Sequence, residues 1–160
     1  MLIKIFTTGG TIDKIYFDRL SEFQIGDPQI AEILEPVHPA FSWEVEAVLR
    51  KDSLDLTDQD RALLRQRIEA DPAERVLVTH GTDTMRETAR ALVGIAGKTV
   101  VLTGALAPAR FKDSDAAFNV GFALGCAQTL PPGIYLAMNG AVFDPFRVRK
   151  NRTQNTFEAE

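Results

Sequence analysis

The chain has 160 residues, a length that fits one domain of ordinary size and excludes a second full-sized domain. Its 45 % hydrophobic and 25 % charged residues are typical of folded globular proteins and exclude disorder by composition. A net charge of −4 gives no reason to expect nucleic acid or an anionic membrane as a partner. The single cysteine, Cys126, excludes an intrachain disulfide framework and a multi-cysteine metal site.

The N-terminal half begins with a short apolar run, Leu2–Thr7, which is typical of a buried strand. This run is too short for a secretion signal, and no apolar run approaches the length of a membrane span, so we expect a cytoplasmic protein. Asp27-Pro28 resembles an N-cap followed by proline, which predicts a helix through Leu34. Alternating apolar residues predict a strand over Phe41–Leu49, with positions 41, 43, 45, 47 and 49 on one side.

Thr57 and Asp60 have the spacing of a capping box at the start of a further helix. From there strands and helices alternate to the end of the chain. The expected strands are Arg75–Thr79, Thr99–Leu102 and Gly133–Met138, and the expected helices are Thr84–Ile95, with Met85, Ala89, Leu92 and Val93 inward, and Asp115–Leu130. This alternation indicates a three-layer α/β domain over residues 1–160, with a mostly parallel sheet and helices on both faces. The basic run near the C-terminus is typical of a solvated segment.

Three of the predicted strands end in small polar loops that contain glycine: Thr7–Thr11, Thr79–Thr84 and Thr103–Ala105. Ligands of parallel sheets bind just beyond the carboxyl ends of the strands. Threonine hydroxyls in two such loops, together with a carboxylate, suit nucleophilic attack on a carbonyl, and the backbone N–H groups can line an oxyanion site.

Taken singly, each loop is more often structural, because threonine and glycine are common in turns and can cap a following helix. His80 is a candidate general base, but a lone histidine at a strand end is more often a structural residue. Gly121-x-x-x-Gly125 is more typical of close helix packing than of a nucleotide-binding loop.

Read together, the segments Thr8-Gly-Gly-Thr-Ile12 and His80-Gly-Thr-Asp-Thr-Met85 resemble the two signature motifs of the bacterial-type L-asparaginase family. They occur in the family's order, and each follows an apolar strand. Leu102–Ala105 and Met138–Lys150 resemble two later segments, so the resemblance covers nearly the whole chain. It implies the family's larger, flavodoxin-like N-terminal domain, with the smaller C-terminal domain absent.

The resemblance implies hydrolysis of L-asparagine to L-aspartate and ammonia through a threonine acyl-enzyme, without a metal or cofactor. Thr11 matches the first catalytic threonine, and Thr82, Asp83 and Lys150 match a second threonine with its aspartate and lysine. Asp83 would orient Lys150 or pair with the substrate ammonium. A serine that binds the substrate carboxylate and two glycines beside the threonines complete the expected site: Ser53, Gly10 and Gly81.

Two positions depart from the family pattern. The family's tyrosine before a Val/Ile-Gly pair is replaced by Phe23, so we expect the earlier Tyr16 to be the partner of Thr11. Leu54 replaces the usual glutamine and cannot hydrogen-bond an amino group, which should weaken discrimination for free amino acids. Because a covering domain is missing, we expect a homo-oligomer, a dimer or tetramer, that excludes water from the site. Two alternatives stay open: hydrolysis of another small amide or lactam, and a non-catalytic module that binds a small ligand.

Overall fold

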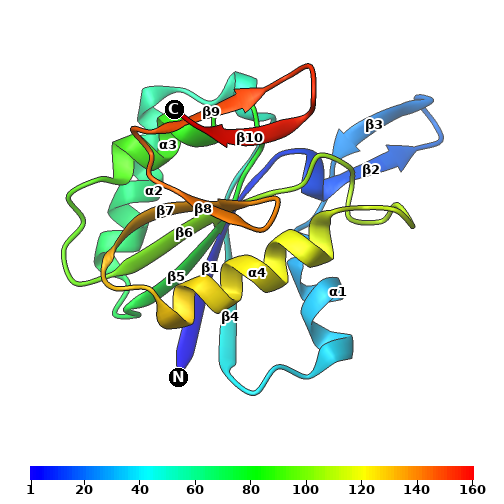
Figure 1. Cartoon of the computed structure of the whole chain (residues 1–160). Coiled ribbons are helices and arrows are strands. Elements are labelled where there is room, and N and C mark those ends of the chain that lie inside the picture. The colour runs from blue at the N-terminus through cyan, green and yellow to red at the C-terminus, as the bar shows by residue number, and fades with distance from the viewer.

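A six-stranded sheet runs through the middle of the molecule, in a computed structural model that describes all 160 residues. The strands lie in the order β4-β1-β5-β6-β7-β8, and all neighbours are parallel except β7 and β8 (Figure 1). They are β1 (Leu2–Gly9), β4 (Ser42–Lys51), β5 (Arg75–Thr79), β6 (Thr99–Thr103), β7 (Gly133–Met138) and β8 (Ala141–Phe143).

Helices cover both faces of this sheet, which confirms the three-layer α/β architecture. They are α1 (Ile30–Leu34), α2 (Asp58–Ala70), α3 (Met85–Leu92) and α4 (Ala116–Thr129). One face packs against α2 and α3 through side chains such as Leu64 and Met85, and the other packs against α1 and α4 through Leu34 and Val120. Because the central strands are covered on both sides, they are continuous apolar runs rather than alternating ones.

The five parallel strands have the flavodoxin-like order. In this order β4, the second of them along the chain, lies on one side of β1, and the three later strands lie on the other side. In chain order the five strands are β1, β4, β5, β6 and β7, and the direction of winding changes between β1 and β5. A crevice forms at such a switch point, at the carboxyl ends of the strands. The loops after β1 and β5 are those that carry Thr11 and Thr82.

Two hairpins stand outside the central sheet: β2 (Lys14–Phe17) with β3 (Glu22–Ile25), and β9 (Val148–Asn151) with β10 (Thr156–Ala159). The second hairpin lies over α3 in Figure 1 and buries Val148 and Phe157 in the core. The basic side chains of this segment are solvated, as expected, at Arg147, Arg149 and Arg152, whereas Lys150 is half-buried. The two buried apolar side chains anchor the hairpin to the core.

The first helix begins later than the Asp27-Pro28 pattern predicts. It starts at Ile30, and its N-cap residue, Gln29, makes no side-chain cap. The Gln29 N–H instead donates to the Asp13 carboxylate at 2.9 Å, while Asp27 pairs with Arg50 on the surface. A tertiary contact thus replaces the local cap.

The helix expected over Thr84–Ile95 is shorter, because α3 ends at Leu92 and Gly94 adopts a left-handed conformation with φ of 95°. Val93 is 42 % exposed, so its expected inward position is wrong.

The side chains of β4 alternate between the two layers. Trp43 and Val45 pack towards α1 and α4, as expected, and Val48 on the opposite face packs towards α2 and α3, while Ala47 is exposed. The register with β1 shifts between Thr7 and Gly9, which marks an irregularity in the pairing near the end of β4.

None of the four helices is both long and apolar enough to cross a membrane.

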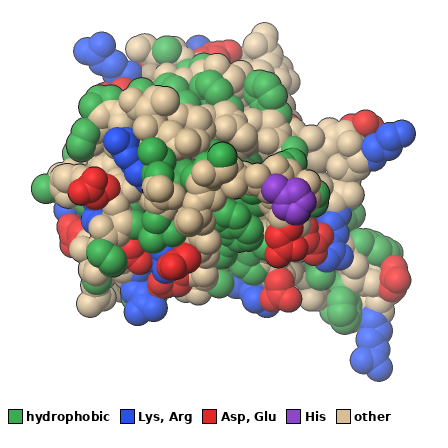
Figure 2. Space-filling view, turned by 90° about the horizontal axis from the view of Figure 1, so that it is seen from below, with side chains coloured by type: hydrophobic (Ala, Val, Ile, Leu, Met, Phe, Trp, Pro, Cys, Tyr) green, Lys and Arg blue, Asp and Glu red, His purple; other side chains and the backbone are tan.

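Figure 2 looks at the end of the sheet where the parallel strands begin, and hydrophobic side chains gather in a hollow on this face. A groove of about 340 Å³ between α1 and α4 has no charged side chain in its lining. The threonine loops lie at the opposite end of the sheet.

Candidate active site

The loops after β1 and β5 touch through their glycines. Gly10 has φ of 86°, a conformation that side chains rarely adopt, and a Cβ added there would lie 2.5 Å from Cα and N of Gly81. A Cβ added to Gly81 would in turn meet the side chain of Ser53 at 2.6 Å. Glycine is required at both positions because the backbones approach too closely for a side chain. This contact brings Thr11, Thr82 and Ser53 to one place.

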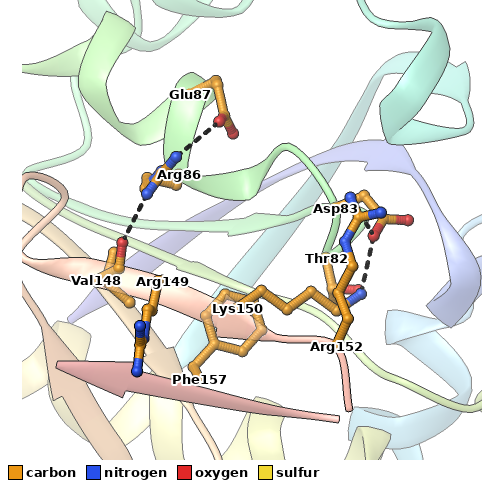
Figure 3. A pocket seen from close by; sticks show the side chains of 9 residues that line it. All are labelled: Thr82, Asp83, Arg86, Glu87, Val148, Arg149, Lys150, Arg152 and Phe157. Carbon is orange, nitrogen blue, oxygen red and sulfur yellow. Dashed lines mark hydrogen bonds and ion pairs between the residues drawn. The ribbon is translucent and has the colours of Figure 1, made fainter. Parts of the chain in front are cut away.

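Lys150 is hydrogen-bonded to both members of the Thr82-Asp83 pair. Its Nζ donates to Thr82 Oγ1 at 2.8 Å and to Asp83 Oδ1 at 3.0 Å, although 68 positions separate Lys150 from Thr82. Figure 3 shows the lysine side chain stretched along its strand towards these two residues. The side chain of Lys150 is 17 % exposed and Thr82 is 7 % exposed. A largely buried hydroxyl therefore faces an amine that a carboxylate holds in position.

The backbone N–H groups of Gly81 and Thr82 donate to no other group of the chain. They lie between the end of β5 and the start of α3, in the loop that Thr82 occupies. Free N–H groups beside a nucleophile are the usual donors to an oxyanion in acyl transfer. This loop can therefore stabilise negative charge that develops on a carbonyl oxygen.

His80 is buried and supports the loop of Gly81 and Thr82 through hydrogen bonds. Complete burial lowers the pKa of His80 to about 4, so its ring is neutral at neutral pH. Its Nδ1 bonds to the Gly81 carbonyl at 2.7 Å and its Nε2 to Thr88 Oγ1 at 2.8 Å. Because the carbonyl can only accept, Nδ1 carries the hydrogen, and Thr88 donates to Nε2. With both nitrogens occupied, His80 holds the Gly81 carbonyl and is not a free base, in agreement with the structural role weighed from the sequence.

Ser53 and Tyr16 lie differently with respect to the threonines. Ser53 opens a short 3₁₀ turn after β4, is buried, and accepts the Thr84 hydroxyl through its carbonyl at 2.6 Å. Tyr16 is on β2 and 52 % exposed, and its ring packs edge-on against Phe23 at 5.4 Å between centroids. The structure thus gathers Ser53 with the two threonines, while Tyr16 stays with the outer hairpin.

Two features of the site were not anticipated from the sequence. Arg152 lies 3.6 Å from Asp83 Oδ1, the oxygen that also accepts from Lys150. Asp13, close to Thr11, is buried and fixes the loop by accepting the Gln29 N–H. Arg152 belongs to the basic run near the C-terminus, and Asp13 directly follows the segment Thr8–Ile12. Neither position carries a local pattern that would reveal its partner.

A pocket of about 200 Å³ opens beside the lysine, between the start of α3 and the hairpin β9–β10. Figure 3 shows the nine side chains that line it. Six of them are charged: Asp83, Arg86, Glu87, Arg149, Lys150 and Arg152. Thr82 therefore lines a pocket in which most of the other side chains are charged.

The chain is similar in sequence to a known protein family and to several of its members. A family model described as the N-terminal domain of asparaginase matches residues 2–159. The probable periplasmic L-asparaginase of Haemophilus influenzae is 32 % identical over 162 aligned positions, which cover 94 % of this chain and 46 % of that protein. This chain spans about half the length of the curated relatives it matches across most of its length.

Two solved structures have the same fold over nearly the whole chain. The thermostable L-asparaginase from Thermococcus kodakarensis superposes with a TM-score of 0.85 at 27 % identity, covering 99 % of this chain and 51 % of that one. A probable cytoplasmic L-asparaginase from Campylobacter jejuni gives a TM-score of 0.78 at 26 % identity, with the same coverage.

Proposed function

This chain belongs to the asparaginase N-terminal domain family, and from that premise we propose that it hydrolyses L-asparagine to L-aspartate and ammonia. The observation that carries the proposal is the Lys150 amine, whose Nζ lies 2.8 Å from Thr82 Oγ1 and 3.0 Å from Asp83 Oδ1. A nucleophile or water next to such a group can be activated, because the aspartate holds the base in a fixed orientation.

We assign the nucleophile to Thr11. Its Oγ1 bonds to the carbon of the side-chain amide, the C–N bond breaks, and the hydroxyl proton leaves with the nitrogen as ammonia. An ester between Thr11 and the aspartyl group remains. The free N–H groups of Gly81 and Thr82 stabilise the oxyanion that forms in this step.

Water then hydrolyses the ester. The water gives a proton to Thr82 as it adds to the ester carbon, Thr82 passes its own proton to the neutral form of Lys150, and a proton returns to Thr11 as the ester bond breaks. Asp83 keeps Lys150 on Thr82 throughout. These steps use only groups of the chain and water, so the proposed reaction needs no metal and no organic cofactor.

Ser53 and Tyr16 complete the proposed site. Ser53, buried against Gly81, binds the substrate carboxylate, and Tyr16 approaches Thr11 if the hairpin β2–β3 folds over the site. A homo-oligomer, a dimer or tetramer, would exclude water from these groups, and light scattering at micromolar concentration tests it. One neighbour is a probable cytoplasmic enzyme and one relative a probable periplasmic one, so the cytoplasmic location stays a prediction.

Ammonia release from L-asparagine tests the reaction. We expect the purified chain to release ammonia, and Thr11→Ala and Thr82→Val to reduce the rate by at least about 10²-fold, the usual range for loss of acid–base or nucleophilic assistance. Thr129→Ala, at an exposed threonine of α4, is the matched control and should keep the rate. No ammonia from asparagine, glutamine or a panel of small amides and lactams would refute an amidohydrolase. Release from the panel but not from asparagine would favour the other-amide alternative.

A further inference from the structure

Arg152 is an arginine that directly contacts the carboxylate of the Thr82-Asp83-Lys150 group. Its guanidinium lies 3.6 Å from Asp83 Oδ1, and Lys150 Nζ lies 3.0 Å from the same oxygen. Figure 3 shows Arg152 running alongside Asp83 at the edge of the pocket. One carboxylate oxygen is therefore shared by two cations.

The other two arginines of the pocket have carboxylate partners elsewhere. Arg149 pairs with Glu158 at 3.1 Å, and Arg86 lies 3.5 Å from Glu87 and from Glu160. Arg152 differs because its partner is Asp83. Asp83 is also the carboxylate that accepts from Lys150, the proposed base, so its charge affects which ligand charges are tolerated beside that lysine.

The position of Arg152 is defined by the turn of its hairpin. Asn151, the last residue of β9, accepts the N–H groups of Thr153 and Gln154 at 3.1 Å through its side-chain oxygen. Its side-chain amide donates to Glu158 at 2.7 Å. These bonds close the turn around Arg152, which places the start of its side chain beside Asp83 rather than leaving it on a free loop.

We propose that Arg152 is a specificity-determining residue that competes with the substrate ammonium for Asp83. This inference rests on the proposed amidohydrolase function. An α-ammonium that enters the site would be a third cation at Asp83, repelled by the guanidinium and by Lys150. The residue after Ser53, Leu54, is exposed and offers no side-chain acceptor in compensation. The substrate class favoured by this arrangement is a short ω-amide with a carboxylate and no free ammonium.

Succinamate provides the test, because it is asparagine without the α-ammonium. We expect the unmodified chain to hydrolyse both amides. Arg152→Gln should lower the KM for asparagine relative to the KM for succinamate by about threefold to fivefold, the range for an exposed ion pair. Arg152→Lys should keep the original KM values. Because the guanidinium is 73 % exposed, 0.5 M salt should shrink the difference between the two proteins.

Arg149→Gln is the matched control, since Arg149 lies in the same hairpin and pocket but pairs with Glu158. It should not change the ratio of the two KM values. Equal shifts for both substrates, no shift in Arg152→Gln, or a fall in kcat alone would overturn the inference while leaving the amidohydrolase in place. So would hydrolysis of asparagine without any hydrolysis of succinamate. No ammonia from any amide would overturn the proposed function and this inference with it.

Discussion

Asp13 makes the stability of this fold depend on pH. Burial raises the pKa of its carboxyl from 3.8 to about 6, against the opposing effects of the Gln29 N–H and of Arg50. The carboxyl is 2 % exposed and accepts a single hydrogen bond, from Gln29. The change in pKa corresponds to about 3 kcal/mol, at 1.36 kcal/mol for each factor of ten. The pKa of Asp13 is higher in the folded state than in the unfolded state. The contribution of the protonated carboxyl to the unfolding free energy is therefore fully present below pH 3.8 and is lost as the pH rises through about 6.

Asp13→Asn keeps the shape and an acceptor for Gln29 but cannot ionise. Relative to this variant, the original chain should lose about 2 kcal/mol of unfolding free energy between pH 4.5 and 7.5, the share of the total that falls in this window. Urea unfolding followed by circular dichroism at both pH values measures this difference. Asp18→Asn, at an exposed position of the hairpin β2–β3, is the control and should show no such change. A difference that does not vary with pH, or one of opposite sign, would refute the argument that desolvation dominates at Asp13.

Three further substitutions test the packing around the site. Thr79→Val should raise the unfolding free energy by about 1 kcal/mol, because the Thr79 hydroxyl is buried without a partner and valine has the same shape; a lower melting temperature would contradict this. Thr57→Ala should lower the unfolding free energy by about 1 kcal/mol through loss of the α2 capping box, with no change in ammonia release. Gly10→Ala should abolish ammonia release and lower stability by at least about 1 kcal/mol, because its Cβ would strike Gly81 in a strained conformation; an active, equally stable variant would show that the two loops need not touch.

The central strands could be predicted from the sequence because each carries its own evidence. Arg75–Thr79 is an uninterrupted apolar run between polar loops, and the structure has a strand at those residues. The Thr57 capping box is likewise local, and both of its hydrogen bonds are present. Elements whose ends depend on contacts with residues elsewhere in the chain were harder to predict from the sequence. The cap expected at Asp27 fails because Asp13, far away in the chain, accepts the Gln29 N–H instead.

The same distinction applies to the site. The threonines could be proposed from their glycine-rich loops, since those loops follow apolar strands. Lys150 has no such local pattern: it lies in a run of basic residues, and only the family resemblance assigned it a role. Its partner Thr82 is 68 positions away, and packing of the hairpin brings the two together. Arg152 was missed for the same reason, because its contact with Asp83 depends on how that hairpin turns.

The hairpin β9–β10 joins the body of the molecule through few apolar anchors, chiefly Val148 and Phe157. A peripheral unit of this kind can detach while the central sheet stays intact, since local opening requires less free energy than global unfolding. Detachment would withdraw Lys150 from Thr82 and Arg152 from Asp83 at once. The proposed hydrolysis and the proposed preference among amides would therefore depend on the same cooperative unit. Mild denaturant should stop ammonia release before the sheet melts, so that ammonia release would report on the docking of this hairpin rather than on the integrity of the whole fold.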